Sequence, residues 1–342
     1  MAQNNTVLLI GGLHFVRKEW EDLRNHAGVS ALKEFPDGDR RQFVAKCDAG
    51  EFDDVVAISR SNDSVKITGP FDEELISHLP KSVLYISHNG AGYDNIDVAA
   101  ATKRGIQVAN TPKAVDDATA DTAIFLMLGA LRQANVGMTA LRQAKWGQVS
   151  LPMAHDPKGK TLGILGMGSI GRNLAAKARA FGMSVQYHNR SRLPPDLEEV
   201  AGTAASYVDF ETLLSTSDVL SLNLSLTAAT ERIIGRRELG MMKRGVTIVN
   251  TARGKLIDEE ALVEALNDGD RVWSVGLDVY ENEPEVHPGL VANERVFLLP
   301  HIGTMTMETR REMELLVIDN IKAALGTGRL LTRVKEQDGM GK

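Results

Sequence analysis

The sequence predicts an α/β protein made of two doubly wound, parallel-sheet domains. The first observation is length, because 342 residues exceed the roughly 100 to 200 residues of an ordinary folding unit. The second is an alternation of short apolar runs with amphipathic segments, which is typical of successive β-α-β units. The third is a glycine-rich turn in mid-chain, which follows an apolar run and opens a second series of the same kind.

The first series contains five predicted strands. They are the apolar runs TVLLIGG, ALKEF, DDVVAIS, SVLYISH and GIQVAN, and segments with helical spacing such as FDEELISHLP and NIDVAAATKRG lie between them. Residues 114–144 then predict a long helix with an acidic first turn, which crosses between the domains. A loop with two prolines and two glycines, residues 145–160, precedes the second series.

The second series contains six predicted strands, TLGILG, SVQYH, DVLSLNL, VTIVN, WSVGLDV and VFLLP. SIGRNLAAKARAFG and DEEALVEALNDG are predicted helices between them, and Asp258 is placed to cap the latter. Residues 307–328 predict a last amphipathic helix. Since no strand follows it, we expect this helix to return to the first domain.

Composition and charge favour a small-molecule partner. A net charge of −6 with scattered basic residues argues against nucleic acid or an anionic membrane as the main partner. TVLLIGG has no basic flank or cleavage site, so it is predicted as a strand and not as a signal peptide, and no apolar run reaches the roughly 18 residues of a membrane span. The single cysteine, Cys47, cannot form an internal disulfide, which favours a cytoplasmic protein, and we interpret it as a packed hydrophobe. No metal site is predicted.

The glycine-rich turn GMGSIG has the spacing of a dinucleotide-binding turn. Gly166 permits the tight turn, Gly168 lets the backbone approach a pyrophosphate, and Gly171 lets helix and strand pack closely. The position of the turn, after a strand and before a helix, supports a functional role over the common occurrence of glycine in turns. The pyrophosphate is then expected at the helix N-terminus, near the N–H groups of Met167, Gly168, Ser169 and Ile170.

The segment after the next strand, HNRSRLPP, carries no acidic residue. An acid about 20 residues after the turn would bind the ribose 2′-hydroxyl of NAD, but the chain has Asn189, Arg190, Ser191 and Arg192 there. Guanidinium groups form charge-assisted hydrogen bonds with a 2′-phosphate, which a carboxylate would repel. The alternative is that both arginines are solvated on a surface turn. Their position favours NADP(H) as the preferred cofactor, with NAD(H) possible.

Three charged residues follow the ends of predicted strands, where ligands of open α/β sheets bind. They are Arg253 after VTIVN, Glu283 after WSVGLDV and His301 after VFLLP. Each has an ordinary structural interpretation when considered alone. Together with a dinucleotide site they favour catalysis on a 2-keto acid.

The chemistry of that reaction assigns each residue a role. The Arg253 guanidinium clamps the substrate carboxylate and polarises the carbonyl, while His301 donates the proton that the developing alkoxide needs. Glu283 fixes the imidazole tautomer and favours the protonated ring, and neighbouring Glu281 is the alternative for this role.

Several motifs in order resemble the D-isomer-specific 2-hydroxyacid dehydrogenase family over nearly the whole chain. They are HNGAGYDNID, NTPKAVDDATADTAIFLML, GMGSIG, VNTARGKLIDEEALVEAL, GLDVYENEP and LLPHIGT. The resemblance implies the same three catalytic residues. It also implies that the backbone of Gly90, Ala91 and Gly92 binds the substrate carboxylate, that Thr251, Asp278 and Gly303 lie by the nicotinamide, and that Leu224 and Ser225 lie near the adenosine side.

The resemblance also implies an architecture. Residues 1–112 and 305–342 would form a discontinuous, flavodoxin-like substrate domain, and residues 113–304 an NAD(P)-binding Rossmann domain, with the site in the cleft. Members are usually homodimers through the cofactor domains, and residues 145–159 would be the arm that makes the contact. Trp146 is either an anchor of that contact or a packed core tryptophan.

Within the family, HNRSR is similar to the NADPH-using glyoxylate and hydroxypyruvate reductases. Two other subgroups are weaker matches. Formate dehydrogenases carry a glutamine shortly before the histidine, where this chain has Leu299 and Pro300. Phosphoglycerate dehydrogenases often add a regulatory domain, which we do not expect here. Met305 stands where a small residue often follows, so a bulkier or aromatic 2-keto acid is an alternative substrate. A second alternative, by analogy of fold, is a corepressor that senses dinucleotide and binds peptides.

Overall fold

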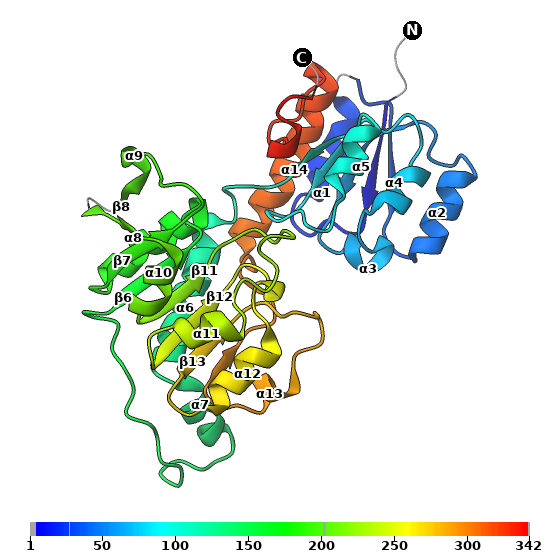
Figure 1. Ribbon diagram of the computed structural model, residues 1–342. Coiled ribbons are helices and arrows are strands. Elements are labelled where there is room, and N and C mark those ends of the chain that lie inside the picture. Colours follow the sequence, from blue (N-terminus) through cyan, green and yellow to red (C-terminus); the bar gives the residue numbers. More distant parts are fainter. Residues whose placement is uncertain (1–4, 27, 201–202, 341–342) are drawn as a thin grey trace. The chain divides into compact units, whose positions relative to one another are not determined.

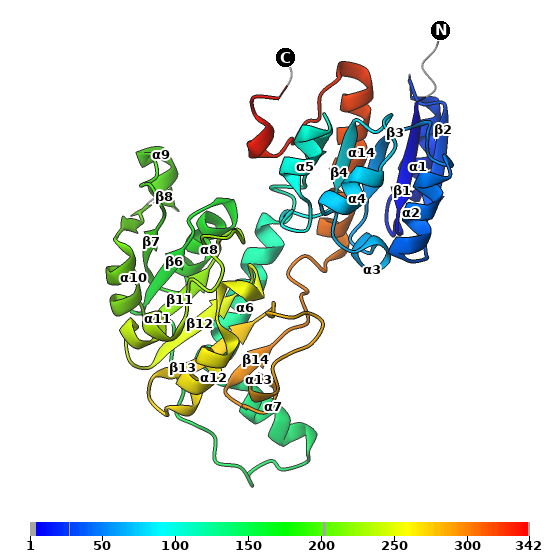
Figure 2. The ribbon, with the colours of Figure 1, turned by 45° about the vertical axis from the view of Figure 1, so that its right-hand side comes forward.

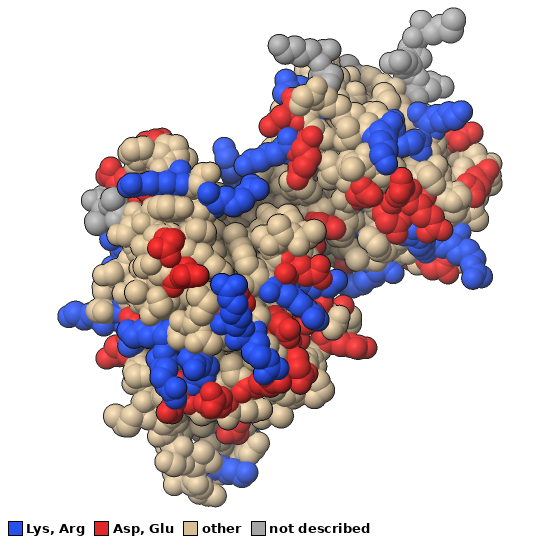
Figure 3. Space-filling model, in the orientation of Figure 1, with Lys and Arg blue, Asp and Glu red and all other residues tan. Residues whose placement is uncertain are grey.

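The computed structural model describes residues 5–26, 28–200 and 203–340. The chain forms two compact units, Met1–Val115 with Met305–Lys342, and Asp116–Thr304. Each contains a parallel sheet with helices on both faces (Figures 1 and 2), so the predicted fold class is confirmed. On the face of each unit seen in Figure 3, basic and acidic side chains are interspersed.

The first unit has five parallel strands in the order β2-β1-β3-β4-β5, the flavodoxin-like order. They are β1 (Thr6–Ile10), β2 (Ala31–Phe35), β3 (Val55–Arg60), β4 (Tyr85–His88) and β5 (Gln107–Ala109), and they coincide with the five predicted runs. The helices are α1 (Arg17–Asp22), α2 (Arg40–Asp48), α3 (Ser64–Thr68), α4 (Glu73–His78), α5 (Val98–Lys103) and α14 (Met307–Thr327), with 3-10 turns η1 (Leu23–Asn25) and η3 (Lys335–Gln337).

Alternate residues of β1 bury opposite faces of this sheet, which is why a short all-apolar run forms a central strand. Leu8 and Ile10 pack in a core shared with α2, α4 and α5. Val7 and Leu9 pack in a second core shared with α1 and α14. The last helix, α14, contacts β3 and β4, so the C-terminal segment closes one face of the first sheet.

The second unit has seven parallel strands in the order β10-β7-β6-β11-β12-β13-β14. They are β6 (Thr161–Leu165), β7 (Ser184–His188), β10 (Ser206–Tyr207), β11 (Val219–Leu222), β12 (Val246–Asn250), β13 (Val272–Leu277) and β14 (Val296–Leu298), beside an antiparallel pair, β8 (Glu199–Val200) and β9 (Thr203–Ala204). The helices are α6 (Asp116–Leu131), α7 (Ala134–Arg142), α8 (Ser169–Ala180), α9 (Pro195–Glu198), α10 (Phe210–Thr216), α11 (Arg236–Met241), α12 (Glu259–Asn267) and α13 (Pro288–Val291), with η2 (Gly254–Leu256).

Six of these strands match the predicted runs, and the two-residue edge strand β10 is an addition. The α6 and α8 helices cover one face of the sheet, and α10, α11, α12 and α13 cover the other. Asp258 caps α12 as predicted, because its carboxylate accepts from the N–H of Ala261 at 3.1 Å.

The predicted helix over residues 114–144 is two helices. Gln133 has a φ of +43° between α6 and α7, and its buried side chain donates to the carbonyl oxygen of Trp273 at 3.2 Å. The expectation that this segment crosses between domains is also wrong for α6, which packs on α8, β12 and β13 within its own unit. No single described helix has the length and apolarity to cross a membrane; α6 and α7 reach them only as a pair, bent by 78°.

Candidate active site

The three glycines of the turn after β6 have different surroundings. Gly166 has a φ of +101°, and a Cβ there would lie 2.7 Å from the carbonyl oxygen of Asn223. A Cβ on Gly171 would lie 2.5 Å from the Gly166 carbonyl oxygen, so this glycine lets α8 pack against β6. A Cβ on Gly168 would meet no described atom within 4 Å. The described chain therefore leaves open the space that a pyrophosphate would need.

The first turn of α8 offers N–H groups to an anion. The first helical hydrogen bond runs from the N–H of Arg172 to the carbonyl of Gly168 at 3.0 Å, so the preceding N–H groups have no partner within the helix. The N–H of Met167 already donates to the Asn189 side chain at 2.7 Å. An anion at this helix end would therefore meet the N–H groups of Gly168, Ser169 and Ile170, at the positive end of the helix dipole.

Neighbouring strand ends also fit a dinucleotide. Strands β6, β11 and β12 are adjacent in the sheet, and the chain order reverses beside β6, where ligands of such sheets bind. Leu224, just after β11, borders the turn, since its side chain would lie 3.0 Å from a Cβ on Gly166, and Ser225 beside it is exposed. Thr251, just after β12, has a buried hydroxyl with no hydrogen-bond partner among the described residues. An unsatisfied buried polar atom at this edge is consistent with a ligand there.

The loop after β7 holds its two arginines differently. Arg190 is exposed, and no described residue forms an ion pair with it. Arg192 is held by the buried carboxylate of Glu198, at 2.8 Å from Nε and 2.9 Å from Nη2. Glu198 also accepts from the hydroxyl of Tyr187 at 2.7 Å. A carboxylate therefore does lie against this loop, from the end of α9, but Arg192 and Tyr187 already engage it. Nη1 is the nitrogen of Arg192 that Glu198 leaves available.

His301 and Glu283 form a hydrogen-bonded pair at the edge where β13 and β14 end. The distance from His301 Nδ1 to Glu283 Oε2 is 2.7 Å, and the other carboxylate oxygen accepts from the N–H of Tyr280 at 3.0 Å. Burial acts to raise the pKa of Glu283, but the hydrogen bond and charge of His301, with the charge of Arg253, lower it below its usual value. The carboxylate is thus ionised at neutral pH, and the ring presents Nε2 away from it.

Asp278 holds the backbone that carries His301. His301 has a φ of +55°, which is unusual for a residue with a Cβ. The two carboxylate oxygens of buried Asp278 accept from the N–H groups of Ile302 and Gly303, both at 2.7 Å. Burial raises the pKa of Asp278, against the effect of these two donors. Asp278 therefore fixes the strained turn from β14, and a strained residue of this kind is common at functional sites.

Arg253 and Glu281 are placed by the loops after β12 and β13. The carbonyl of Arg253 accepts from the side chain of Asn250 at 2.8 Å, and its Nη1 donates to the carbonyl of Ala252 at 2.7 Å. Glu281 accepts from Arg232 at 2.5 Å, so its carboxylate is engaged by a different side chain. Of the two glutamates considered from the sequence, Glu283 is the one that contacts the imidazole.

The loop of residues 90–92 lies in the first unit and turns its carbonyls to the protein. Thr111 donates its N–H to the carbonyl of Gly90 at 3.0 Å, and the Asn110 amide donates to that of Ala91 at 2.7 Å. The N–H of Gly90 donates to the carbonyl of His88 at 3.1 Å. In the part of the chain that is described, the N–H groups of Ala91 and Gly92 have no acceptor. Two successive free N–H groups are suited to an anion such as a carboxylate.

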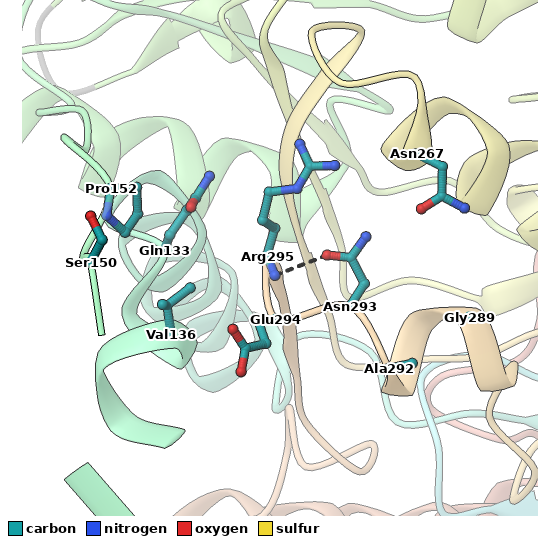
Figure 4. Close-up of a pocket in the computed structure, with 10 residues that line it drawn as sticks. All are labelled: Gln133, Val136, Ser150, Pro152, Asn267, Gly289, Ala292, Asn293, Glu294 and Arg295. Atoms are coloured by element: carbon teal, nitrogen blue, oxygen red, sulfur yellow. Dashed lines mark hydrogen bonds between the residues drawn. The ribbon is translucent and has the colours of Figure 1, made fainter. Parts of the chain in front are cut away.

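A cavity of about 580 Å³ in the Asp116–Thr304 unit lies away from these residues. None of the predicted site residues lines it. Figure 4 shows the lining residues, which are Gln133, Val136, Ser150, Pro152, Asn267, Gly289, Ala292, Asn293, Glu294 and Arg295.

The described residues include no group of three His, Cys, Asp or Glu that could hold a metal ion. Burial raises the pKa of the Cys47 thiol to about 12, which leaves it unreactive as a nucleophile.

Comparison with known proteins identifies the family. Residues 124–303 match the model of the D-isomer specific 2-hydroxyacid dehydrogenase, NAD binding domain. The chain belongs to this family. It is 58% identical over 333 residues to 4-methyl-2-oxopentanoate reductase A of Aspergillus oryzae, covering 97% of this chain and 98% of that protein.

Two solved structures of family members have the same fold. The glyoxylate reductase from Paecilomyes thermophila is 60% identical, with a TM-score of 0.94 over 98% of this chain and 99% of that one. An NADPH-dependent glyoxylate/hydroxypyruvate reductase from Sinorhizobium meliloti, in complex with NADP and malonate, is 30% identical, with a TM-score of 0.80 over 98% and 97% of the two chains. This 2-hydroxyacid dehydrogenase is therefore an oxidoreductase with a Rossmann NAD-binding domain.

Sequence reasoning missed two features of the site in this dehydrogenase. Glu198 lies six residues beyond Arg192, in a helix of four residues, and neither periodicity nor a motif indicates that the two pair. The role of Asp278 in holding the backbone after His301 was also missed. Its signal was present, because an acidic residue directly after a buried strand is itself buried and needs donors.

Proposed function

We propose that the protein is an NADPH-dependent reductase of small 2-keto acids, with glyoxylate and hydroxypyruvate as substrates. The observation that carries this proposal is the His301–Glu283 pair, with Arg253 close enough for its charge to lower the pKa of Glu283. An acid, its carboxylate partner and a guanidinium at adjoining strand ends are the groups that reduction of a 2-keto acid requires.

Each residue has a defined task in this proposal. A bound nicotinamide dinucleotide supplies the hydride. His301 holds a proton on Nε2 for the carbonyl oxygen, because Glu283 accepts from Nδ1 and stabilises the protonated ring. Arg253 binds the substrate carboxylate and stabilises negative charge on the carbonyl oxygen. The free N–H groups of Ala91 and Gly92 are further donors for the carboxylate.

The dinucleotide is assigned to the turn after β6. Gly168, Ser169 and Ile170 would bind the pyrophosphate, Leu224 and Ser225 would lie on the adenosine side, and Thr251 would lie by the nicotinamide with Asp278 and Gly303 behind it. Arg190, with Asn189, Ser191 and the remaining Nη1 of Arg192, would bind the 2′-phosphate. The complex of the Sinorhizobium meliloti relative with NADP supports this preference.

A second candidate substrate is a branched 2-keto acid, which the name of the Aspergillus oryzae relative favours. Oxidation of NADPH measured with glyoxylate, hydroxypyruvate, 4-methyl-2-oxopentanoate and phenylglyoxylate separates the candidates. We expect the highest kcat/KM with the first two, and with NADPH over NADH. A higher kcat/KM for the branched or aromatic acid would transfer the proposal to that substrate, and no oxidation with any of them would refute it.

We also propose a homodimer formed through the Asp116–Thr304 unit. Trp146 is 85% exposed and Met153 is 91% exposed, so the alternative that packs Trp146 in the core is wrong. Leu141 and Leu151, in the same stretch of sequence, are also exposed, and exposed apolar residues that gather in a patch mark interfaces. Analytical ultracentrifugation of the wild type and of Trp146→Ala should show a dimer that the substitution weakens; a monomeric wild type would contradict the assignment.

The cytoplasmic location stays a prediction.

A further inference from the structure

His88 lies directly beneath the loop that is proposed to bind the substrate carboxylate. It is the last residue of β4 and is 3% exposed. A Cβ on Gly90 would lie 2.5 Å from Nε2 of His88. The imidazole therefore occupies the space that a side chain at position 90 would need. The same nitrogen is 3.1 Å from the carbonyl oxygen of Gly92. The third carbonyl of the loop is therefore bound by a side chain.

Arg60 determines which ring nitrogen of His88 carries the proton. It is the last residue of β3, its side chain is fully buried, and its Nη1 is 2.9 Å from His88 Nδ1. Burial lowers the pKa of Arg60 to about 10, which still leaves a cation at neutral pH. A guanidinium can only donate hydrogen bonds. Nδ1 therefore accepts, and Nε2 carries the hydrogen that is donated to Gly92.

The environment of Arg60 shows that its charge is retained at a cost. The guanidinium lies 4.9 Å from the centre of the Phe71 ring, and Nη1 also approaches the Asn95 amide oxygen at 3.4 Å. The negative charge of Asp94 favours the cation. Its Nε and Nη2 nonetheless have no hydrogen-bond partner among the described residues. A buried, incompletely satisfied charge is unfavourable to stability, and this calls for an explanation in function.

We propose that Arg60 and His88 are positioning residues that hold residues 90–92 in the conformation that binds the substrate carboxylate. The inference rests on the proposed function, because that function assigns the loop to the substrate. The chain Arg60 to His88 to Gly92 fixes one carbonyl, and Thr111 and Asn110 fix the other two. With all three carbonyls bound, the free N–H groups of Ala91 and Gly92 need no ordering when the carboxylate arrives.

The test uses full-length His88→Phe and His88→Gln, with His78→Gln as the matched control. His78 lies in the same unit and its side chain contacts Asp48, away from the loop. Steady-state kinetics with glyoxylate and NADPH, and inhibition by oxamate as a carboxylate probe, are measured for each folded variant. We expect His88→Phe to raise the KM for glyoxylate and the oxamate inhibition constant together by about tenfold, which corresponds to one buried hydrogen bond.

A positioning role predicts that the KM for NADPH stays at the wild-type value in His88→Phe. The control should match the wild type, and His88→Gln should recover part of the loss, since its amide can still donate to Gly92. A folded His88→Phe with unchanged KM for glyoxylate, or with a loss confined to kcat, would overturn the inference.

A second measurement is independent of turnover. The nitrogen chemical shifts of His88 in the wild type should show a proton on Nε2 and none on Nδ1 at neutral pH. A proton on Nδ1 would overturn the inference even where His88→Phe fails to fold. If the wild type reduced no 2-keto acid, the proposed function would fail, whereas the NMR result would still report on the Arg60–His88 contact.

Discussion

Substitution of Gly168 by alanine should weaken cofactor binding without lowering the stability of the fold. A Cβ at this position would meet nothing within 4 Å among the described atoms, and the backbone, with φ −76° and ψ −160°, is open to alanine. The loss of a glycine cap costs up to about 1 kcal/mol, and the reduced entropy of the unfolded chain returns about 0.4 to 1 kcal/mol. We therefore expect a melting temperature near that of the wild type.

Gly171→Ala is the matched control with the opposite expectation. Its Cβ would lie 2.5 Å from the Gly166 carbonyl oxygen and 3.2 Å from Ile164 Cγ2, and neither β6 nor the turn can move freely. Overpacking of this kind lowers the free energy of unfolding by about 1 to 3 kcal/mol. Each kcal/mol lost lowers the melting temperature by about 2 to 4 °C. We expect Gly171→Ala to lower the melting temperature by about 2 to 12 °C.

The assay is thermal unfolding of the two variants beside titration with NADPH. For Gly168→Ala we expect unchanged stability and at least about tenfold weaker NADPH binding, because the added methyl group occupies the space proposed for the pyrophosphate. Gly168→Ala that bound NADPH with wild-type affinity would refute the placement of the pyrophosphate. A large loss of its stability would refute the steric reasoning.

Three further predictions concern individual side chains. Glu283→Gln should lower kcat about 10²-fold, because the ring of His301 loses the charge that stabilises its protonated form, and an unchanged kcat would count against the pair. Since the pKa of Glu283 is lowered in the fold, the contribution of its carboxylate to folding stability should be present at neutral pH and lost as the pH falls through that lowered value. Arg190→Ala should raise the KM for NADPH about tenfold and leave that for NADH unchanged, and Arg192→Ala should have a smaller effect because Glu198 already engages two of its nitrogens; equal effects on both nucleotides would exclude binding of the 2′-phosphate. Asp278→Asn should lower both kcat and the melting temperature, because an amide cannot accept from both Ile302 and Gly303, and a variant with wild-type kcat would show that His301 does not need this support.

The sheets were predictable because buried parallel strands are continuous apolar runs, and eleven such runs became strands. The two-residue strand β10, Ser206–Tyr207, has no such run and is set by pairing with β7. The break at Gln133 was missed because neither glycine nor proline marks it. A buried hydrogen bond from its amide to Trp273 accompanies the break, and sequence periodicity does not report such a contact.

The proximity of His301 and Glu283 could be predicted because strand ends of a parallel sheet lie at one edge, and the proposed chemistry then restricts the residue types. The partners that hold these residues could not. The hydrogen bonds of Glu198 with Arg192 and of Arg60 with His88 join side chains whose distances depend on how loops fold over the strand ends. Fold-level patterns place such residues on the same edge but do not show which of them pair.

The central claim is that His301 donates the proton in an NADPH-dependent reduction. The most direct measurement is kcat for glyoxylate reduction by His301→Gln, compared with the wild type under saturating NADPH. The account predicts a loss of about 10² to 10⁴, the usual contribution of a general acid, with NADPH binding retained. Turnover within about tenfold of the wild type would contradict it, because so small a loss is below what proton donation contributes.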